Sequence, residues 1–472
     1  MTSLPSVGEV RLGLSVSAAR AAAAVIQRLG RGGGTSAPGL IAQKIDPAML
    51  TRLAGQLEHG AIVVAGTNGK TTTSRIVADI LDANGHTVVH NRSGSNLVRG
   101  VFTAFAAQAS FTGKVRGDVA VVETDEAAFP AILELVRPRT ILLNNLFRDQ
   151  LDRYGELDTV ARTWKTALAR VDATAVIVYN ADDPGLSWVV DGSPAKLVPF
   201  GLTETRHVLS ELPHAADAAV CRWCGADLTY DGLYLSHLGN WSCPACGHRR
   251  APLAFAGHDI ELRGVTSLAL TVDAGEESTE FEVGIPGMYN AYNVVAAVAA
   301  THTAGVPFSV SQQAIAAFTS AFGRIERVTW KGRQFTIALV KNPVGFNEVM
   351  RMLTAGDGTL AVPTMIAIND LYADGRDVSW LWDVDFELLA EGGAELSTSG
   401  LRGPDMANRL KYAGVAEERI RPLPDDLEAG LDAFTDQIPE GGEGYILPTY
   451  TAMLEIRRIL AERGAIQAFW EQ

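Results

Sequence analysis

A glycine-punctuated turn within residues 61–73 is the part of the chain best suited to chemistry. The segment reads Ala-Ile-Val-Val-Ala-Gly-Thr-Asn-Gly-Lys-Thr-Thr-Thr, an apolar run that breaks into the turn and then opens a helix. Such turns bind phosphate through exposed backbone N–H groups and the positive end of the helix dipole. Lys70 is expected to reach the β- and γ-phosphates from a solvent-facing position, and the Thr71 hydroxyl to hold Mg²⁺. The predicted phosphate-binding residues are consecutive: Gly66, Thr67, Asn68, Gly69, Lys70, Thr71 and Thr72.

An acidic residue ends the apolar run 118–123, which predicts a strand. Functional groups of a parallel sheet gather at the carboxyl ends of its strands, and a carboxylate there can serve as a magnesium ligand. Glu123 is therefore predicted to bind Mg²⁺ beside Thr71. The same rule selects Asp182 and Asp183 after the run 175–180, but helix capping and turn formation explain these two acids equally well.

The four cysteines of the chain form two close pairs. Cys221 and Cys224 are separated by two residues, as are Cys243 and Cys246, and eighteen residues lie between the pairs. This spacing is typical of a zinc ribbon, in which two tight turns present four thiolates to one ion. Disulfides would be the alternative, but a P-loop chain without an export signal is expected to be reduced. Four thiolates leave no open coordination position, so the predicted Zn²⁺ is structural.

The remaining pattern positions these sites in an α/β protein of several domains. A chain of 472 residues exceeds what one core usually supports. Apolar runs at 61–65, 118–123, 140–145 and 175–180 alternate with helical segments, which indicates a parallel sheet covered on both faces. An N-terminal helical segment is expected over 1–45.

Charge and hydropathy exclude two classes of partner. Asp and Glu number 54 against 40 Lys and Arg, a net charge of −14, which argues against nucleic acid as a main ligand. The Ala-rich stretch 17–26 is too short to cross a bilayer and is predicted to form an amphipathic helix. We expect a cytoplasmic protein that touches a membrane at most peripherally, through its substrate.

Two later motifs complete a family pattern. Gly287-Met-Tyr-Asn290-Ala-Tyr-Asn293 precedes an Ala/Val helix, and Gly323-Arg324 follows about thirty residues later. In this order after a short P-loop, they resemble the adenine-site motif and the phosphate-contacting arginine of the Mur ligase superfamily, ATP-dependent enzymes that join amines to carboxylates. Tyr289 stands where that motif usually has histidine.

The resemblance implies further site residues and a fold. Asn290 and Asn293 would lie at the adenine site, Arg324 against the phosphates, and Lys341 at the nucleotide contact of the C-terminal domain. Lys70, Glu123 and Arg324 would then be catalytic. The implied fold is a P-loop central domain with a parallel sheet over 46–325, interrupted by the ribbon at about 216–252, and a Rossmann-like α/β domain over 326–472. Lys165 is either a carbamylated, magnesium-bridging residue or a solvated helix lysine.

Two features indicate which branch of the superfamily the chain resembles: the cysteine ribbon and the length of the segment before the P-loop. Peptidoglycan amino-acid ligases place a UDP-sugar domain before their P-loop, whereas this P-loop strand begins near residue 61. A Cys₄ ribbon followed by Ala-Asp-Gly-Arg-Asp-Val-Ser-Trp at 373–380 resembles the MurT family, the synthetase subunits of lipid II isoglutaminyl synthase. That resemblance implies ATP-dependent amidation, through an acyl-phosphate, of the α-carboxylate of D-glutamate in the lipid II stem peptide to D-isoglutamine.

Amidation raises the question of where ammonia comes from. Glutamine hydrolysis commonly uses a thiolate, but all four cysteines are assigned to zinc. The resemblance implies a heterodimer with a GatD-type glutamine amidotransferase, whose Cys-His pair takes its orienting carboxylate from this chain. Asp374 and Asp377 are the candidates, although either could be a hydrogen-bonded turn residue. The alternatives are a folylpolyglutamate-synthase-like ligase, which a different loop after the P-loop helix disfavours, and a zinc-ribbon ATPase that binds nucleic acid.

Overall fold

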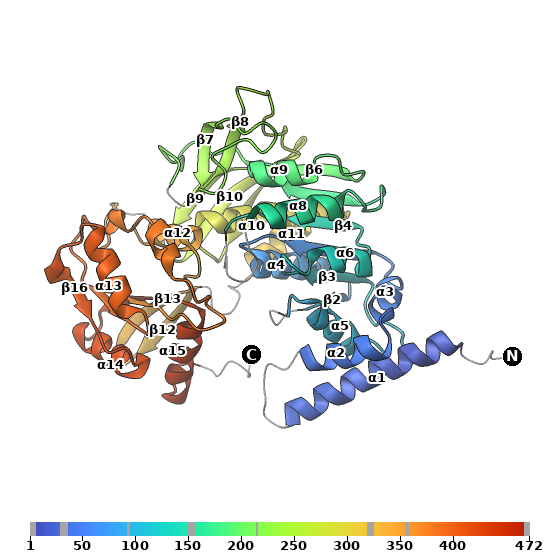
Figure 1. Ribbon diagram of the computed structural model, residues 1–472, viewed down its shortest axis with the longest axis horizontal. Helices are drawn as coiled ribbons and strands as arrows, with labels where there is room; N and C mark the ends of the chain where they lie inside the picture. The colour runs from blue at the N-terminus through green and yellow to red at the C-terminus, as the bar shows by residue number, and fades with distance from the viewer. Residues whose placement is uncertain are drawn as a thin grey trace.

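Two β-sheets organise the chain, as the computed structural model shows (Figure 1). The structure describes residues 6–28, 36–91, 95–148, 157–213, 216–318, 325–354 and 358–466. The larger sheet has nine strands in the order β11-β10-β9-β6-β5-β4-β1-β3-β2. The strands are β1 Gly60–Ala65, β2 Val88–His90, β3 Val119–Glu123, β4 Thr140–Leu143, β5 Val176–Asn180, β6 Lys196–Leu202, β9 Phe255–Arg263, β10 Ser267–Ala274 and β11 Glu277–Val283.

The predicted parallel α/β arrangement is confirmed for the part of this sheet from β2 to β6. Strand β1 lies between β3 and β4 and pairs with both in parallel, with Val64 opposite Glu123. The sheet then continues into β9, which pairs with β6 in parallel. Strand β10 pairs with both β9 and β11 in antiparallel fashion. This antiparallel extension was not predicted from the sequence.

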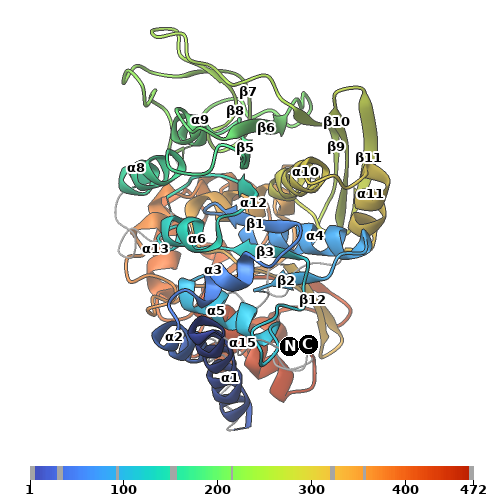
Figure 2. The ribbon, with the colours of Figure 1, turned by 90° about the vertical axis from the view of Figure 1, so that its right-hand side faces the viewer.

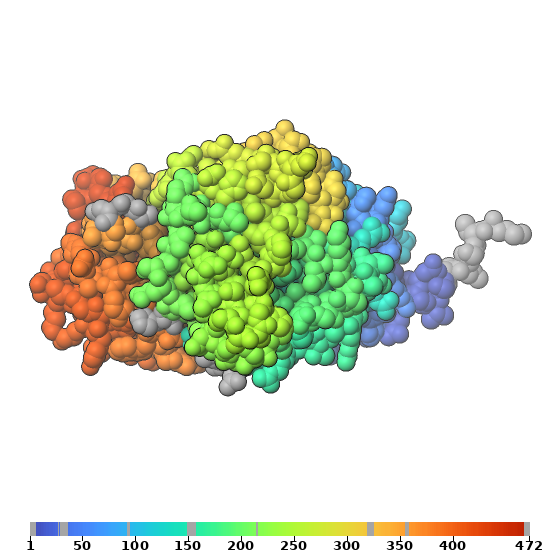
Figure 3. Space-filling model, turned by 90° about the horizontal axis from the view of Figure 1, so that it is seen from above, coloured from blue at the N-terminus to red at the C-terminus, as the bar shows by residue number. Residues whose placement is uncertain are grey.

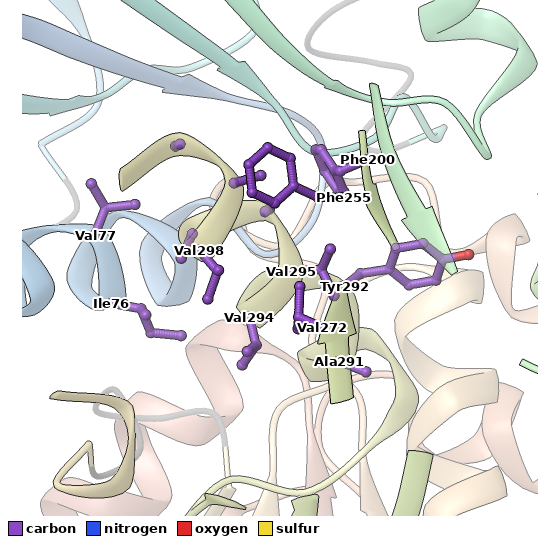
Figure 4. Packing of buried hydrophobic residues seen from close by; sticks show 14 of the residues in the cluster. Ile76, Val77, Phe200, Phe255, Val272, Ala291, Tyr292, Val294, Val295 and Val298 are labelled. Carbon is purple, nitrogen blue, oxygen red and sulfur yellow. The ribbon is translucent and has the colours of Figure 1, made fainter. Parts of the chain in front are cut away.

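Helices cover both faces of the larger sheet because the side chains of each strand alternate between the faces. Ile62 and Val64 of β1 belong to the core beneath α4 and α10, while Ala61 and Val63 belong to the opposite core. Figure 4 shows valines of α10 packed with Ile76 and Val77 of α4. The helices are α1 Val7–Arg28, α2 Ser36–Ile45, α3 Met49–Ala54, α4 Lys70–Ala83, α5 Val98–Ala107, α6 Phe129–Val136, α8 Leu157–Leu168, α9 Pro184–Val190, α10 Met288–Thr303 and α11 Phe308–Ala316.

A two-stranded antiparallel hairpin carries the cysteine pairs on its flanks. Its strands are β7 Thr229–Leu235 and β8 Leu238–Ser242. The hairpin stands above the sheet near β6 and α9 (Figure 1). It is tied down by the Trp241 indole, which donates to the carbonyl of Ala181 over 2.9 Å.

The smaller sheet has six strands in the order β12-β13-β17-β14-β15-β16 and forms a separate layered unit. Its elements are β12 Ile325–Trp330, β13 Arg333–Ala338, α12 Pro343–Leu353, β14 Thr364–Ala367, η1 Ser379–Asp383, η2 Phe386–Leu389, β15 Leu396–Ser399, α13 Gly403–Tyr412, η3 Glu417–Arg419, β16 Ile420–Pro422, α14 Leu427–Gln437, β17 Glu443–Pro448 and α15 Tyr450–Glu462. Seen from above, this unit and the N-terminal helices occupy opposite ends of the molecule (Figure 3). Among the described helices, none has the length and apolar character needed to cross a bilayer.

Candidate functional site

The predicted phosphate loop connects β1 to α4 in a conformation that requires glycine. Gly66 and Gly69 have φ values of 147° and 83°, which side chains rarely allow. A Cβ built on Gly69 would lie 2.1 Å from the Oδ1 atom of Asn293. Both glycines are therefore required by backbone shape and by close neighbours, which are Asn144 and Asn145 after β4 for Gly66 and Asn293 of α10 for Gly69.

Residues after β4 hold this loop in place. The Asn145 amide accepts from the Asn68 backbone N–H over 2.8 Å and donates to the Asn68 carbonyl over 3.0 Å. The Thr67 hydroxyl donates to the carbonyl of Phe147, and the Phe147 N–H donates back to that hydroxyl, each over 3.0 Å. The carboxyl end of a neighbouring strand thus shapes the loop, as expected for a parallel sheet.

Lys70 is buried, which contradicts the expectation that it faces solvent. Its side chain donates to the carbonyls of Gly66 and Thr67 over 2.6 and 3.2 Å and to the Glu126 carboxylate over 2.9 Å. Lys70 is only 8% exposed, and Glu126 is buried with it. Sequence reasoning missed Glu126, although its position three residues after Glu123 was a usable signal.

Thr71 and Glu123 meet as the sequence predicted. The Thr71 hydroxyl donates to the Glu123 carboxylate over 3.1 Å. Glu123 is buried, and its backbone exchanges two hydrogen bonds with the Asn91 amide, over 2.8 and 2.9 Å. A hydroxyl and a carboxylate at this spacing offer the oxygen ligands that magnesium prefers.

A chain of buried polar side chains connects α10 to the phosphate loop. The Asn290 amide donates to the carbonyl of Pro286 over 2.6 Å, and its oxygen accepts from Asn293 over 2.9 Å. The Asn293 oxygen accepts from the Thr73 hydroxyl over 3.2 Å, and that hydroxyl accepts from Asn144 over 2.9 Å. The structure therefore brings the predicted Asn290 and Asn293 to the base of α4.

A pocket opens where the central sheet, the hairpin and the C-terminal unit meet. Its lining includes the phosphate loop residues Asn68 and Gly69, the predicted Asn293 and Lys341, and residues that the sequence did not indicate: Leu235, Leu238, Tyr292, Val344 and Glu348. Burial raises the pKa of Glu348. Across this pocket the Asn342 amide donates to the Asn68 side-chain oxygen over 3.0 Å. The C-terminal unit thus contacts the phosphate loop directly.

The four cysteines form one cluster, in which all the sulfur atoms lie within 4.8 Å of one another. The Sγ atoms of Cys221 and Cys246 are 3.6 Å apart, and those of Cys224 and Cys243 are 3.5 Å apart. These separations are far longer than a disulfide and close to the edge of a tetrahedron with metal–sulfur bonds of about 2.3 Å. The donor set therefore fits one metal ion.

The two cysteine turns have the same backbone hydrogen bonds. Gly225 N–H donates to the carbonyl of Cys221 over 2.7 Å, and Gly247 N–H donates to that of Cys243 over 3.0 Å. The backbone N–H of Cys246 lowers the pKa of Cys243 to about 6. Burial and the neighbouring cysteines raise the pKa of Cys221, so the backbone amides favour the thiolate at Cys243 in particular.

Asp182 and Asp183 have structural roles. Of the two interpretations of this segment, helix capping and turn formation therefore fit better than a magnesium site. Asp183 accepts from the N–H groups of Gly185 and Leu186 and so caps α9. Asp182 is buried against Arg250 and Tyr292, which donate to it over 2.8 and 2.7 Å. Burial raises the pKa of Asp182.

Lys165 also lies among groups unsuited to a carbamate. Its ammonium donates to the carbonyls of Trp188 and Asp191 over 2.5 and 2.9 Å and lies 4.4 Å from the centroid of the Trp188 ring. Carbonyl oxygens and a π-face favour a cation, so Lys165 is a partly exposed helix lysine. Arg324, the predicted phosphate contact, lies outside the described residues.

The two candidate aspartates differ in accessibility. Asp374 is buried and accepts from the Thr451 backbone N–H over 2.8 Å and from the Thr451 hydroxyl, at the start of α15. Burial raises the pKa of Asp374. Asp377 is exposed, and hydrogen bonds from Ser379 lower the pKa of its carboxyl group. Of the two, Asp377 is the one that presents an ionised carboxylate at the surface.

Two solved structures share the fold of this chain. A pseudomurein peptide ligase type C from Methanothermus fervidus matches with a TM-score of 0.65 and 16% identity, covering 85% of this chain and 78% of that one. MurF from Acinetobacter baumannii matches with a TM-score of 0.63 and 15% identity, covering 89% of this chain and 80% of that one. At these identities the likeness establishes the fold.

Sequence comparisons are more specific. The Mur ligase middle domain family matches residues 64–216, and the MurT ligase C-terminal family matches residues 339–453. The "Lipid II isoglutaminyl synthase (glutamine-hydrolyzing) subunit MurT" of Streptococcus pneumoniae is 32% identical, with 96% of this chain and 98% of that protein aligned. The subunit of the same name from Staphylococcus aureus is also 32% identical, over 81% and 84% of the two chains. The chain therefore belongs to the MurT family of Mur ligases.

Proposed function

We propose that this chain is the ligase subunit of a lipid II isoglutaminyl synthase. It would activate the α-carboxylate of D-glutamate in the lipid II stem peptide with ATP and amidate it to D-isoglutamine. Family membership and the names of the two relatives support this activity. The observation that carries it is the contact of Asn342 with Asn68, because it joins the C-terminal unit to the phosphate loop beside a pocket that both Asn68 and the predicted Lys341 line.

The reaction needs two displacements. A carboxylate oxygen of D-glutamate attacks the γ-phosphorus of ATP, and ADP leaves. Ammonia then attacks the acyl carbon, the C–O bond to phosphate breaks, and a proton passes from nitrogen to the released phosphate or to water. Activation is required because a carboxylate is inert toward ammonia at neutral pH.

Residues of the loop would stabilise the negative charge of both steps. Lys70 would exchange its contacts with Glu126 and the loop carbonyls for phosphate oxygens, and the loop N–H groups would bind the same phosphates. Thr71 and Glu123 would hold Mg²⁺, which neutralises phosphate charge when bound. Arg324 remains a proposed phosphate contact.

Ammonia would come from a GatD-type glutamine amidotransferase in a heterodimer. The chain has four cysteines, and all four lie in the metal cluster, so it offers no other thiol for glutamine hydrolysis. We propose Asp377 as the carboxylate that orients the partner's catalytic histidine, since it is exposed and its pKa is lowered. Asp374 would position the loop by holding the start of α15.

The cysteine cluster would hold a structural Zn²⁺. Four thiolates in near-tetrahedral positions favour zinc among the common intracellular ions. The ion would fix the hairpin, whose residues Leu235 and Leu238 line the pocket. We also propose that the reaction takes place in the cytoplasm, and that the chain divides into a central domain over 46–325 and a C-terminal domain over 326–472, a division that the two separate sheets support.

Isotope transfer tests the acyl-phosphate. Lipid II labelled with ¹⁸O in the D-glutamate α-carboxylate is incubated with ATP and ammonium chloride, and the released phosphate is analysed by mass spectrometry. One ¹⁸O atom should appear in each phosphate released. Unlabelled phosphate would contradict direct carboxylate activation, and ATP hydrolysis that responds to a soluble pterin glutamate instead of lipid II would favour the folylpolyglutamate-type alternative.

A further inference from the structure

Helix α1 is apolar on two opposite faces. Its inner face contributes Leu12, Val16 and Ala19 to the core. The outer face carries Val7, Val10, Leu14 and Val25, whose exposed fractions run from 47% to 86%. An exposed apolar face of this kind, flanked by polar residues such as Glu9 and Arg28, marks a surface that contacts protein or membrane.

The outer residues form one continuous stripe. Val7, Val10, Leu14 and Val25, together with the exposed Ala21, recur at intervals of three, four or seven residues, which places them on one side of an α-helix. The stripe runs nearly the full length of α1, which has 22 residues. Beside it, Phe111 is also exposed, and the Arg20 guanidinium lies 4.5 Å from the centroid of its ring.

The charge of this region is opposite to that of the whole chain. Helices α1 and α2 contain four basic residues, Arg11, Arg20, Arg28 and Lys44, and one acidic residue, Glu9. The complete chain has a net charge of −14. A basic, apolar helix surface is the combination that binds anionic bilayers.

The position of α1 leaves its outer face accessible. Helix α1 packs against α2, α3 and α5 and lies at the lower edge of the molecule in Figure 2. Figure 1 shows α1 along the lower edge of the molecule toward the right, and the C-terminal unit, whose residues include Asp377, on the left.

We infer that the outer face of α1 binds the surface of an anionic lipid bilayer, with the helix lying in the plane of the interface. This inference rests on the proposed function, because a lipid-linked substrate is held in a membrane. Val7, Val10, Leu14, Val25 and Phe111 would enter the headgroup region, and Arg28 would contact lipid phosphates. Binding there would bring the ligase to the membrane that holds its substrate.

Vesicle sedimentation tests the inference. The full chain is mixed with vesicles of phosphatidylglycerol and phosphatidylcholine, or of phosphatidylcholine alone, with zinc present. The unaltered chain should sediment with the anionic vesicles, and V10E/L14E should lower its partition at least tenfold. The matched control is Val208→Glu, at a loop residue with 44% exposure, which should sediment normally. Equal binding of V10E/L14E and the unaltered chain would overturn the inference.

Two further measurements distinguish bilayer binding from misfolding of the variant and from self-association. Hydrogen exchange in residues 7–28 of the unaltered chain should slow when anionic vesicles are added, a result that does not depend on a variant folding. Size-exclusion chromatography should show the unaltered chain and V10E/L14E at the same mass. A dimer that V10E/L14E dissociates would assign the stripe to a second copy of the chain and overturn the membrane assignment.

Amidation assays with two forms of lipid II distinguish failure of this inference from failure of the proposed function. Relative to the unaltered chain, V10E/L14E should raise the apparent KM several-fold for lipid II in vesicles. The same variant should leave amidation of a short-chain, water-soluble lipid II analogue unchanged. If the unaltered chain amidated neither substrate, the proposed ligase function would be wrong. If the unaltered chain and V10E/L14E had equal kinetics with lipid II in vesicles, only the inference that α1 binds the membrane would be wrong.

Discussion

Lys70 donates to three oxygen acceptors within a buried site. Its substitution is therefore expected to lower folding stability as well as activity. A cation that pairs with Glu126 at 2.9 Å inside the protein leaves a buried carboxylate behind when it is deleted. Removing one partner of a buried ion pair costs about 3–5 kcal/mol of folding stability. Loss of activity in a Lys70 variant must therefore be separated from loss of fold.

Lys70→Ala should lower ATP turnover by on the order of 10³-fold, since one preorganised charge on the transferred phosphate has about that effect. The double variant K70A/E126Q removes the stranded carboxylate and should recover thermal stability without recovering turnover. Steady-state ATPase assays and thermal melts measure both quantities. Recovery of turnover in the double variant would contradict a phosphate-binding role for Lys70.

Substitutions of Asp377 and Asp374 should have different effects on amidation with glutamine and with ammonium chloride. Asp377→Asn should abolish glutamine-dependent amidation in the complex with the glutaminase but leave amidation with ammonium chloride intact, because the ATP site lies elsewhere. Asp374→Asn should lower the melting temperature, since Asp374 accepts from the start of α15. If the loss of glutamine-dependent activity followed Asp374→Asn instead, the assignment would move to the buried residue.

At the level of secondary-structure elements, the hairpin connects the four-cysteine cluster to the pocket. The Arg351 guanidinium on α12 donates to the carbonyl of Tyr234 in β7 over 2.9 Å. Leu235 and Leu238, at the hairpin tip, form part of the pocket lining. A change at the cysteines should therefore reach the nucleotide site through β7 and β8.

Metal analysis should find about one zinc ion per chain. Cys224→Ser should lose most of that zinc, lower the melting temperature and raise the KM for ATP, because the hairpin is no longer fixed. Cys224 is an exposed ligand, so the serine itself adds no strain to the core. Full zinc content in the variant, or no zinc in freshly reduced unaltered protein, would contradict the metal assignment.

Local patterns predicted some of these elements well. The run 118–123 became β3, and the cysteine spacing produced the two matching turns, because consecutive residues specify both features. The partners of Lys70 and Asn68 could not be predicted in the same way. Glu126 and Asn342 meet them across 56 and 274 positions of sequence, so their contacts depend on how the elements pack. The burial of Lys70 follows from that packing.

At the scale of the whole molecule, Asn342 connects the two sheets at the pocket. Its oxygen caps α12 through Gly345, and its amide donates to Asn68. One side chain therefore positions a helix and contacts the phosphate loop. Through this contact, nucleotide binding at the phosphate loop could change how the C-terminal unit is positioned against the central sheet.

Asn342→Ala should raise the KM for ATP several-fold and cost about 1 kcal/mol of stability through the lost cap. Asp426→Ala is the matched control, because Asp426 caps α14 through Ala429 in the same way. It should lower stability by a similar amount without changing the KM. Equal KM effects in the two variants would show that the contact with Asn68 has no role in nucleotide binding.

The central claim is that the chain uses ATP to amidate lipid II. The most direct measurement is ADP formation by the purified chain with lipid II and ammonium chloride, together with mass spectrometry of the stem peptide. We expect ADP to form only when lipid II and ammonium chloride are both present, with one isoglutamine, about 1 Da lighter than glutamate, for each ADP. ATP hydrolysis that is independent of lipid II, or a stem peptide of unchanged mass, would contradict it.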